Sequence, residues 1–237
     1  MPDLRRRRSV SQSHLDEVLT AQLAAWSHGH PGRDVVDLGG GTGGMAMGLG
    51  ASGYRVRVVD PSPDALAALE RRTAEEGLAD RVTAIQGDAT ELLDLVGPDS
   101  VDLVVCHKVL EVVEDPGEAL AAVAGVLRPG GALSLVVAQR HAAVLTQAQS
   151  GHIAQARRVW NDPNAFDRER ILRLVTAAGF EVRTTHGVGT VSGHVAEAVL
   201  ETEQGAHSEL LGLEAEVAED PAFQALAPHL HVFAIRP

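Results

Sequence analysis

A run of glycines follows directly on a short apolar segment near the start of the chain. Residues 35–38 read Val-Val-Asp-Leu, and only Thr42 interrupts the glycines that come next, Gly39, Gly40, Gly41, Gly43 and Gly44. This order predicts a buried strand, a tight turn and the start of a helix. Because glycine has no Cβ, the backbone of such a turn can contact a ligand, and the free N–H groups of the helix start point toward it. The segment therefore predicts a site for a nucleotide-like cofactor.

The acids around the glycines narrow the choice of cofactor. Gly39-x-Gly41-x-x-Gly44 matches the dinucleotide fingerprint, and Asp60 follows about 20 residues later, where an acid binds ribose hydroxyls. A nicotinamide-dependent oxidoreductase and an enzyme with an adenosine-based methyl donor both fit this pattern. Asp37 favours the methyl donor, because a carboxylate inside the strand can hold the turn or meet a cationic amino-acid group. Asp88 favours it too, because it can accept a hydrogen bond from an exocyclic amine such as that of adenine.

Strands and helices alternate along the chain and position these residues. Apolar runs predict strands at 34–38, 55–60, 82–86, 101–106, 132–138, 180–185 and 229–235. Helical spacing and caps predict helices at 9–26, 43–52, 62–77, 89–96, 116–127, 150–160 and 167–178, with residues 139–164 otherwise irregular. The first five strands are apolar and each precedes a helix, which predicts an α/β fold with a doubly wound, mostly parallel sheet covered on both faces.

Two parts of the chain fall outside this alternation. Residues 1–32 are expected to form an N-terminal helical segment, and residues 33–237 a single α/β domain. Between the sixth and seventh strands, residues 191–221 contain eight acidic residues and no lysine or arginine. This composition predicts a small acidic helical insert with one solvated face.

The composition limits the partners and the compartment. The formal net charge is −12, which disfavours general nucleic-acid binding, although Arg5–Arg8 form a local basic patch. Cys106 is the only cysteine, so no intrachain disulfide is possible and a cytoplasmic location is expected. No apolar run approaches the roughly 20 residues that span a membrane, and no secretory signal is apparent. His229 and His231 share a strand face without a matching acid or cysteine, so no metal site is expected. The oligomeric state is left open.

Four motifs together resemble those of class I S-adenosylmethionine (SAM)-dependent methyltransferases. They are Asp37-x-Gly39-x-Gly41, Asp60, Asp88 and Leu127-Arg128-Pro129-Gly130-Gly131, and the resemblance covers residues 35–138. It implies a Rossmann-like sheet of seven strands, with the last strand antiparallel between the fifth and the sixth. It also implies that the donor's methionine part lies over Gly39, Gly40 and Gly41, its ribose on Asp60, and its adenine against Pro61, Asp88 and Ala89. S-adenosylhomocysteine (SAH) would be the product.

The residues after the fourth and fifth strands are the candidates for handling the methyl acceptor. Methyl transfer is an in-line displacement at a sulfonium, so the enzyme mainly aligns the acceptor and excludes water. An amine or hydroxyl acceptor can also need a base, whereas a carboxylate does not. After the fourth strand, His107 can contact the donor or act as a base, and Glu111 is a second catalytic candidate. After the fifth, Arg140 and His141 could bind an acidic substrate.

Further motifs resemble a narrower branch, the transfer-RNA wobble-uridine carboxymethoxy methyltransferases, which methylate a carboxylate on a modified base. They include His107-x-Val109-Leu110-Glu111, Ala178-Gly179-Phe180 and His229-Leu230-His231-Val232. The chain departs from that branch at Gly189-Thr190-Val191 and in a basic stretch reduced to Arg157-Arg158. We therefore favour methyl transfer to oxygen or nitrogen of a small acceptor, which could be acidic. The tRNA reaction and a SAM-binding protein without catalysis remain alternatives, and an oxidoreductase is disfavoured.

Overall fold

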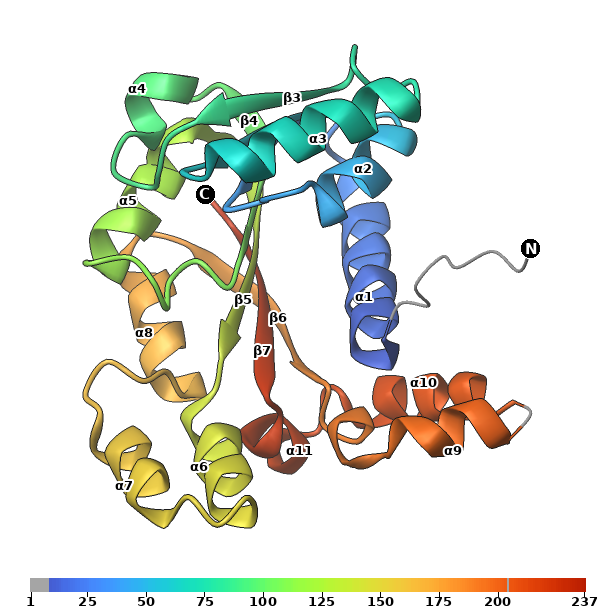
Figure 1. Ribbon diagram of the computed structural model, residues 1–237. Coiled ribbons are helices and arrows are strands. Elements are labelled where there is room, and N and C mark those ends of the chain that lie inside the picture. The colour runs from blue at the N-terminus through green and yellow to red at the C-terminus, as the bar shows by residue number, and fades with distance from the viewer. Residues whose placement is uncertain (1–8, 204) are drawn as a thin grey trace. The chain divides into compact units, whose positions relative to one another are not determined.

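Seven strands among the described residues form one sheet. The computed structural model describes residues 9–203 and 205–237 (Figure 1), so the basic patch Arg5–Arg8 lies outside the described residues. The strands lie in the order β3-β2-β1-β4-β5-β7-β6. Their bounds are β1 Asp34–Leu38, β2 Arg55–Asp60, β3 Val82–Gln86, β4 Val101–His107, β5 Leu127–Ala138, β6 Glu181–Val188 and β7 His229–Ile235. The α/β fold predicted from the sequence is confirmed.

Backbone hydrogen bonds fix the directions of the strands. β1 pairs in parallel with β2 and β4, β2 with β3, and β4 with β5. Along β5 and β7, Gly130 N–H donates to Arg236 O at 2.7 Å, and Gln139 N–H donates to Pro228 O at 2.9 Å. Rising residue numbers in β5 thus meet falling numbers in β7. The last strand is therefore antiparallel, as the family resemblance implies.

Helices connect most of the strands. Their bounds are α1 Val10–Ser27, α2 Gly44–Ala51, α3 Pro63–Glu75, α4 Leu92–Val96, α5 Pro116–Val126, α6 Arg140–Gln149, α7 Ile153–Asn161, α8 Arg168–Ala177, α9 Glu197–Thr202, α10 Ala206–Val217 and α11 Pro221–Leu226, with a 3₁₀-helix at Ser192–His194. α5 starts where the carboxylate of Asp115 accepts hydrogen bonds from the N–H groups of Gly117 and Glu118. Among the described residues, no helix has the length and apolar character required to cross a membrane.

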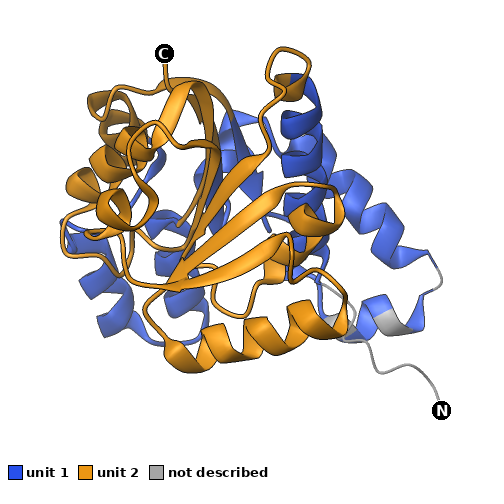
Figure 2. Ribbon diagram, turned by 90° about the horizontal axis from the view of Figure 1, so that it is seen from above, with its two compact units in different colours: residues 1–25, 138–168, 185–231 blue, residues 26–137, 169–184, 232–237 orange. Residues whose placement is uncertain are grey.

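The chain divides into two compact units, coloured separately in Figure 2. Unit 2 comprises residues 26–137, 169–184 and 232–237, and the described part of unit 1 comprises 9–25, 138–168, 185–203 and 205–231. In unit 2, β1 and β4 form the centre of the core, where Val36, Val104 and Cys106 are fully buried. Unit 1 contains α6, α7 and the helices of the acidic insert. The domain boundary after residue 32 stays a prediction.

Two local predictions were wrong, both around β5. Residues 139–164 were expected to hold one helix, and they form two, α6 and α7. α6 has no side-chain N-cap and buries only Ala142, so few sequence signals mark it. Residues 128–131, which the sequence left between the helix at 116–127 and the strand at 132–138, belong instead to β5. Gly130 and Gly131 exchange hydrogen bonds with Arg236, directly after β7.

Candidate active site

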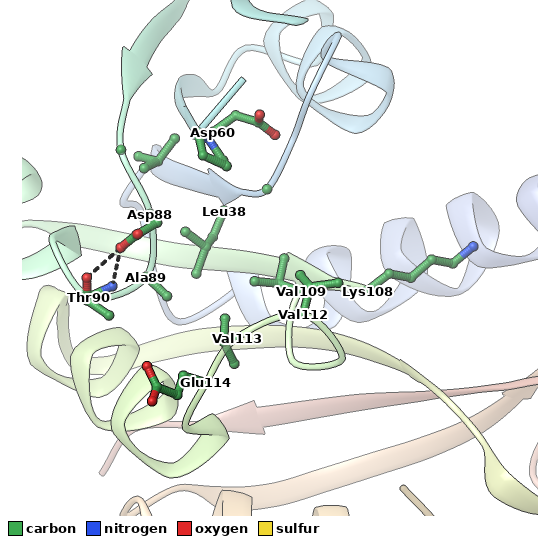
Figure 3. Close-up of a pocket in the computed structure, with 14 residues that line it drawn as sticks. Leu38, Asp60, Asp88, Ala89, Thr90, Lys108, Val109, Val112, Val113 and Glu114 are labelled. Carbon is green, nitrogen blue, oxygen red and sulfur yellow. Dashed lines mark hydrogen bonds between the residues drawn. The ribbon is translucent and has the colours of Figure 1, made fainter. Parts of the chain in front are cut away.

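A cavity of about 440 Å³ lies in unit 2, at the carboxyl ends of β1, β2 and β4 (Figure 3). Its volume is within the range of sites that bind small molecules. The cavity brings together five of the predicted donor-binding residues, Gly39, Asp60, Pro61, Asp88 and Ala89. The segment after β4 supplies most of the remaining wall, including Lys108, Val109, Val112, Val113 and Glu114. Asp37, Gly40 and Gly41 are not part of its lining.

Asp60 is held rigidly at the end of β2. One carboxylate oxygen accepts a hydrogen bond from the N–H of Gly41 at 2.9 Å, and the other accepts one from the N–H of Ser62 at 2.9 Å. Only 8% of the residue is exposed. Each oxygen keeps a further lone pair, so a diol could be bound without reorganising the carboxylate.

At Gly39 and Gly40, close contacts in the glycine turn leave no space for a side chain. Gly39 and Gly41 have φ angles of +69° and +54°, in the left-handed region that favours glycine. A Cβ on Gly39 would come within 2.5 Å of the side chain of Val109. A Cβ on Gly40 would come within 2.5 Å of a carboxylate oxygen of Asp37. The turn therefore presents bare backbone beside the cavity.

Asp37 is a buried carboxylate without a full set of partners. The residue is 3% exposed, and its Oδ2 has no hydrogen-bond partner among the described residues. Burial raises the pKa of Asp37 to about 7; a hydrogen bond from the Ala46 backbone opposes this rise, and the charge of Asp60 adds to it. An unsatisfied carboxylate beside a glycine turn suits a ligand that brings a cation.

Asp88 is ordered by the residue two positions later. Its Oδ1 accepts hydrogen bonds from the hydroxyl and the backbone N–H of Thr90, at 2.6 and 2.8 Å (Figure 3). These bonds, the hydroxyl first, hold the pKa of Asp88 below its ordinary value. The carboxylate is thus an ionised acceptor at the rim of the cavity.

His107 is not among the residues that line the cavity. Its Nε2 lies 2.8 Å from the hydroxyl of Ser134 on the neighbouring strand β5. Burial, together with the positive charge of Lys108, lowers the pKa of His107 to about 3. The imidazole is therefore neutral at physiological pH and takes up a proton poorly. Glu111 is exposed in the turn between β4 and α5 and does not line the cavity either.

Lys108 lines the cavity, although it is not among the donor-binding, catalytic and substrate-binding residues predicted from the sequence. It is the only lysine of the chain, and its φ of +61° is unusual for a residue with a side chain. Its N–H donates to Val136 O at 2.8 Å, which holds this conformation in place. Among the described residues that line the cavity, Lys108 is the one cation, beside the carboxylates of Asp60, Asp88 and Glu114. Its position directly after an apolar strand is the signal that could have identified it.

Arg140 and His141 belong to unit 1, whereas unit 2 alone forms the cavity. The guanidinium of Arg140 donates to the backbone oxygen of Ala165 at 2.7 Å and to that of Trp160 at 3.5 Å. The His141 ring lies against Trp160, with centroids 6.1 Å apart. Both side chains thus contact the end of α7 or the segment that links it to α8. Their predicted contact with substrate stays a prediction.

One of the two histidines of β7, His231, contacts a second buried histidine in unit 1. His231 is fully buried, and its Nδ1 lies 3.3 Å from Nδ1 of His186. In the described part of the chain, no group of three or more histidine, cysteine or acidic residues is arranged to hold a metal ion.

Comparisons with known proteins show what the chain is similar to. Residues 36–135 match the family described as a methyltransferase domain. The tRNA 5-carboxymethoxyuridine methyltransferase of Escherichia coli K12 is 26% identical over 212 residues, which cover 86% of this chain and 80% of that protein. A ubiquinone biosynthesis O-methyltransferase of Burkholderia thailandensis is 34% identical over 106 residues, or 44% of each chain. The structure of the plantazolicin methyltransferase BamL with SAH has a TM-score of 0.62 at 13% identity, covering 96% of this chain and 89% of that one.

These findings identify the class of the protein. The chain is a class I SAM-dependent methyltransferase, with the mostly parallel seven-stranded sheet of that class. The residues present fit the cofactor: the unpartnered Oδ2 of Asp37 suits its ammonium group, and the bare glycine turn leaves room for its methionine part.

Proposed function

We propose that the cavity of unit 2 is the donor site and that each predicted residue holds one part of SAM. Asp60 binds the ribose hydroxyls, Asp88 accepts from the adenine amine, and Pro61 and Ala89 pack against the ring. Gly39, Gly40 and Gly41 pass under the methionine part, whose ammonium group is attracted by Asp37. The main support for this proposal is that five predicted residues line one cavity although they follow or end three different strands, β1, β2 and β3. They are Gly39, Asp60, Pro61, Asp88 and Ala89.

The proposed acceptor is a carboxylate oxygen of a small acid. SAM supplies a methyl group that its sulfonium already activates, so the chain mainly orients the acceptor and excludes water. A base is needed for a hydroxyl or ammonium acceptor, but the low pKa of His107 makes this residue a poor one. A carboxylate needs no base. Lys108 lines the cavity with its side chain extended away from the other labelled lining residues (Figure 3), and rotation of this flexible side chain would bring its ammonium group to a bound carboxylate. In this proposal, Lys108 replaces Arg140 as the substrate contact.

A second candidate acceptor is the carboxylate of a modified wobble uridine in tRNA. The relative from Escherichia coli that is named for this reaction matches 86% of the chain, whereas the ubiquinone relative matches only 44%. The net charge of −12 weighs against RNA, which places the small acid first. Both candidates share the carboxylate chemistry, and for both we place the reaction in the cytoplasm.

Transfer of radiolabelled methyl from SAM tests the proposal. The purified protein is incubated with a panel of small carboxylic acids and, separately, with tRNA from cells that lack the wobble methyltransferase. A methyl ester releases labelled methanol in mild base, whereas methylated nitrogen does not. Base-labile label on a small acid supports the first candidate, and label on tRNA supports the second. Base-stable product would overturn the carboxylate proposal, and binding of NADH in place of SAH would overturn the donor site. Asp60→Ala serves as the inactive control.

A further inference from the structure

Exposed apolar side chains gather in unit 1. Among the described residues, nine large hydrophobic side chains are exposed, and seven of them belong to unit 1. Three lie on the α6–α7 hairpin, namely Leu145, Ile153 and Trp160, and four lie on the insert and the helix after it, namely Val199, Leu213, Phe223 and Leu226. Single exposed apolar residues are ordinary, but two concentrations in one unit indicate surfaces that become covered.

The exposed apolar residues of the α6–α7 hairpin lie beside positively charged side chains. Ile153, Arg157 and Trp160 are four and three residues apart on α7, so they share one side of the helix, with Arg158 beside them. We call these four residues the basic face. Ile153 is 60% exposed and Trp160 54% exposed, and a hollow of about 710 Å³ runs along Ile153, Arg157 and Arg158. Residues 139–166 carry three arginines and one aspartate in a chain whose net charge is −12.

The exposed apolar residue of α10 lies beside negatively charged side chains. Glu209, Leu213 and Glu216 are exposed on α10, again four and three residues apart, and we call them the acidic face. Glu214 points the other way: it is 1% exposed and accepts a hydrogen bond from the N–H of Val191 at 2.9 Å. This inward anchor fixes which side of α10 faces outward. The acidic face therefore presents a leucine between two carboxylates.

We propose that the basic face of one molecule docks on the acidic face of a second copy of the chain. The two faces are complementary, since one places an arginine between apolar residues and the other an apolar residue between carboxylates. Within unit 1, Figure 1 shows α7 and α10 as separate helices that do not adjoin, and the residues of both faces are exposed in the described part of the chain. In a two-fold symmetric dimer, the basic face of each molecule contacts the acidic face of the other. All four faces are then covered, so no further copy can be added through them. This pairing is independent of the proposed acceptor.

Charge reversal in two matched variants tests the pairing. Arg157→Glu with Arg158→Glu makes both faces acidic, and Glu209→Arg with Glu216→Arg makes both faces basic. We expect the wild type to sediment as a dimer that higher salt weakens, and each variant alone to associate at least about tenfold more weakly. Mixing the two variants should restore a dimer, because the reversed faces of one variant then meet those of the other. Arg71→Glu with Arg173→Glu, on residues outside both faces, controls for the change in net charge.

The mixing step also distinguishes lost association from lost folding, since misfolded variants could not form the mixed dimer. Trp160 gives a second readout, because the other tryptophan, Trp26, is only 9% exposed and changes little. Its emission should shift to the blue as the dimer forms. A wild type that stays monomeric at every concentration overturns the proposal. Variants that dimerise alone, or a mixture that stays monomeric, overturn it as well.

Discussion

Replacing Asp37 by asparagine should change how the stability of the protein depends on pH. The carboxyl has an ordinary pKa of 3.8 and a folded pKa of about 7, chiefly because it is buried. Below pH 3.8 it is protonated in both the folded and the unfolded state. Between these two values the unfolded chain releases a proton that the folded chain retains, so the free energy of unfolding falls as the pH rises.

The size of this effect follows from the shift. Between the two pKa values, the free energy of unfolding falls by about 1.36 kcal/mol for each pH unit. Raising the pH from about 5 to about 7 therefore lowers it by roughly 2.7 kcal/mol. The residue is 3% exposed, so solvent screens this effect little. His107 acts in the opposite direction, because its pKa is lowered and its protonation in acid destabilises the fold. The informative quantity is therefore the difference between wild type and Asp37→Asn, in which the contribution of His107 cancels.

Urea denaturation of both proteins at several pH values between about 5 and 8 measures this difference. We expect the free energy of unfolding of Asp37→Asn, relative to that of the wild type, to rise by roughly 2.7 kcal/mol over this pH range. Above the folded pKa this difference should rise no further. The same substitution should weaken SAH binding and abolish proton release on binding, seen by calorimetry in buffers of different ionisation enthalpy. Parallel stability curves for the two proteins would refute the account of Asp37 as a buried carboxyl that gives up its proton to accommodate a cation.

Three further predictions concern the turn, the acceptor chemistry and the far end of the sheet. Gly40→Ala should lower stability by about 1–3 kcal/mol and weaken SAH binding, because its Cβ meets Asp37, as thermal melts with and without SAH would reveal. Because the pKa of His107 is lowered to about 3, we expect the pH profile of kcat to lack an inflection near 6.5 and His107→Gln to keep most activity. A bell-shaped profile that is lost in His107→Gln would contradict this expectation. Asp102→Ala should cost about 1–3 kcal/mol in urea without changing SAH affinity, because Asp102 accepts hydrogen bonds from Asp34 N–H and Arg128 at the amino ends of the strands.

Much of the cavity lining is predictable from the sequence because backbone geometry determines it. A glycine turn after β1, an acid at the end of β2 and an acid shortly after β3 reach one edge of a parallel sheet wherever the strands have this order. The pattern of residues therefore predicts a shared site for Gly39, Asp60 and Asp88, and one cavity contains all three.

The environments of the residues predicted to handle the methyl acceptor depend on tertiary contacts, which the spacing of residues in the sequence does not encode. His107 is a plausible base by position, but its low pKa comes from burial and from Lys108, and its hydrogen bond to Ser134 depends on the register of β4 and β5. The hydrogen bonds that Arg140 donates to backbone oxygens likewise depend on its position in α6, a helix that the sequence pattern did not predict. Tertiary packing determines these contacts, and the local sequence pattern does not encode them.

Calorimetric titration of the wild-type protein with SAH, beside an identical titration with NADH, tests the central claim most directly. The account predicts saturable binding of one SAH per chain, lost in Asp60→Ala while the far-ultraviolet circular dichroism is unchanged, and no binding of NADH. Absence of SAH binding by the folded protein, or SAH binding that Asp60→Ala leaves intact, would contradict the assignment of this cavity as the donor site.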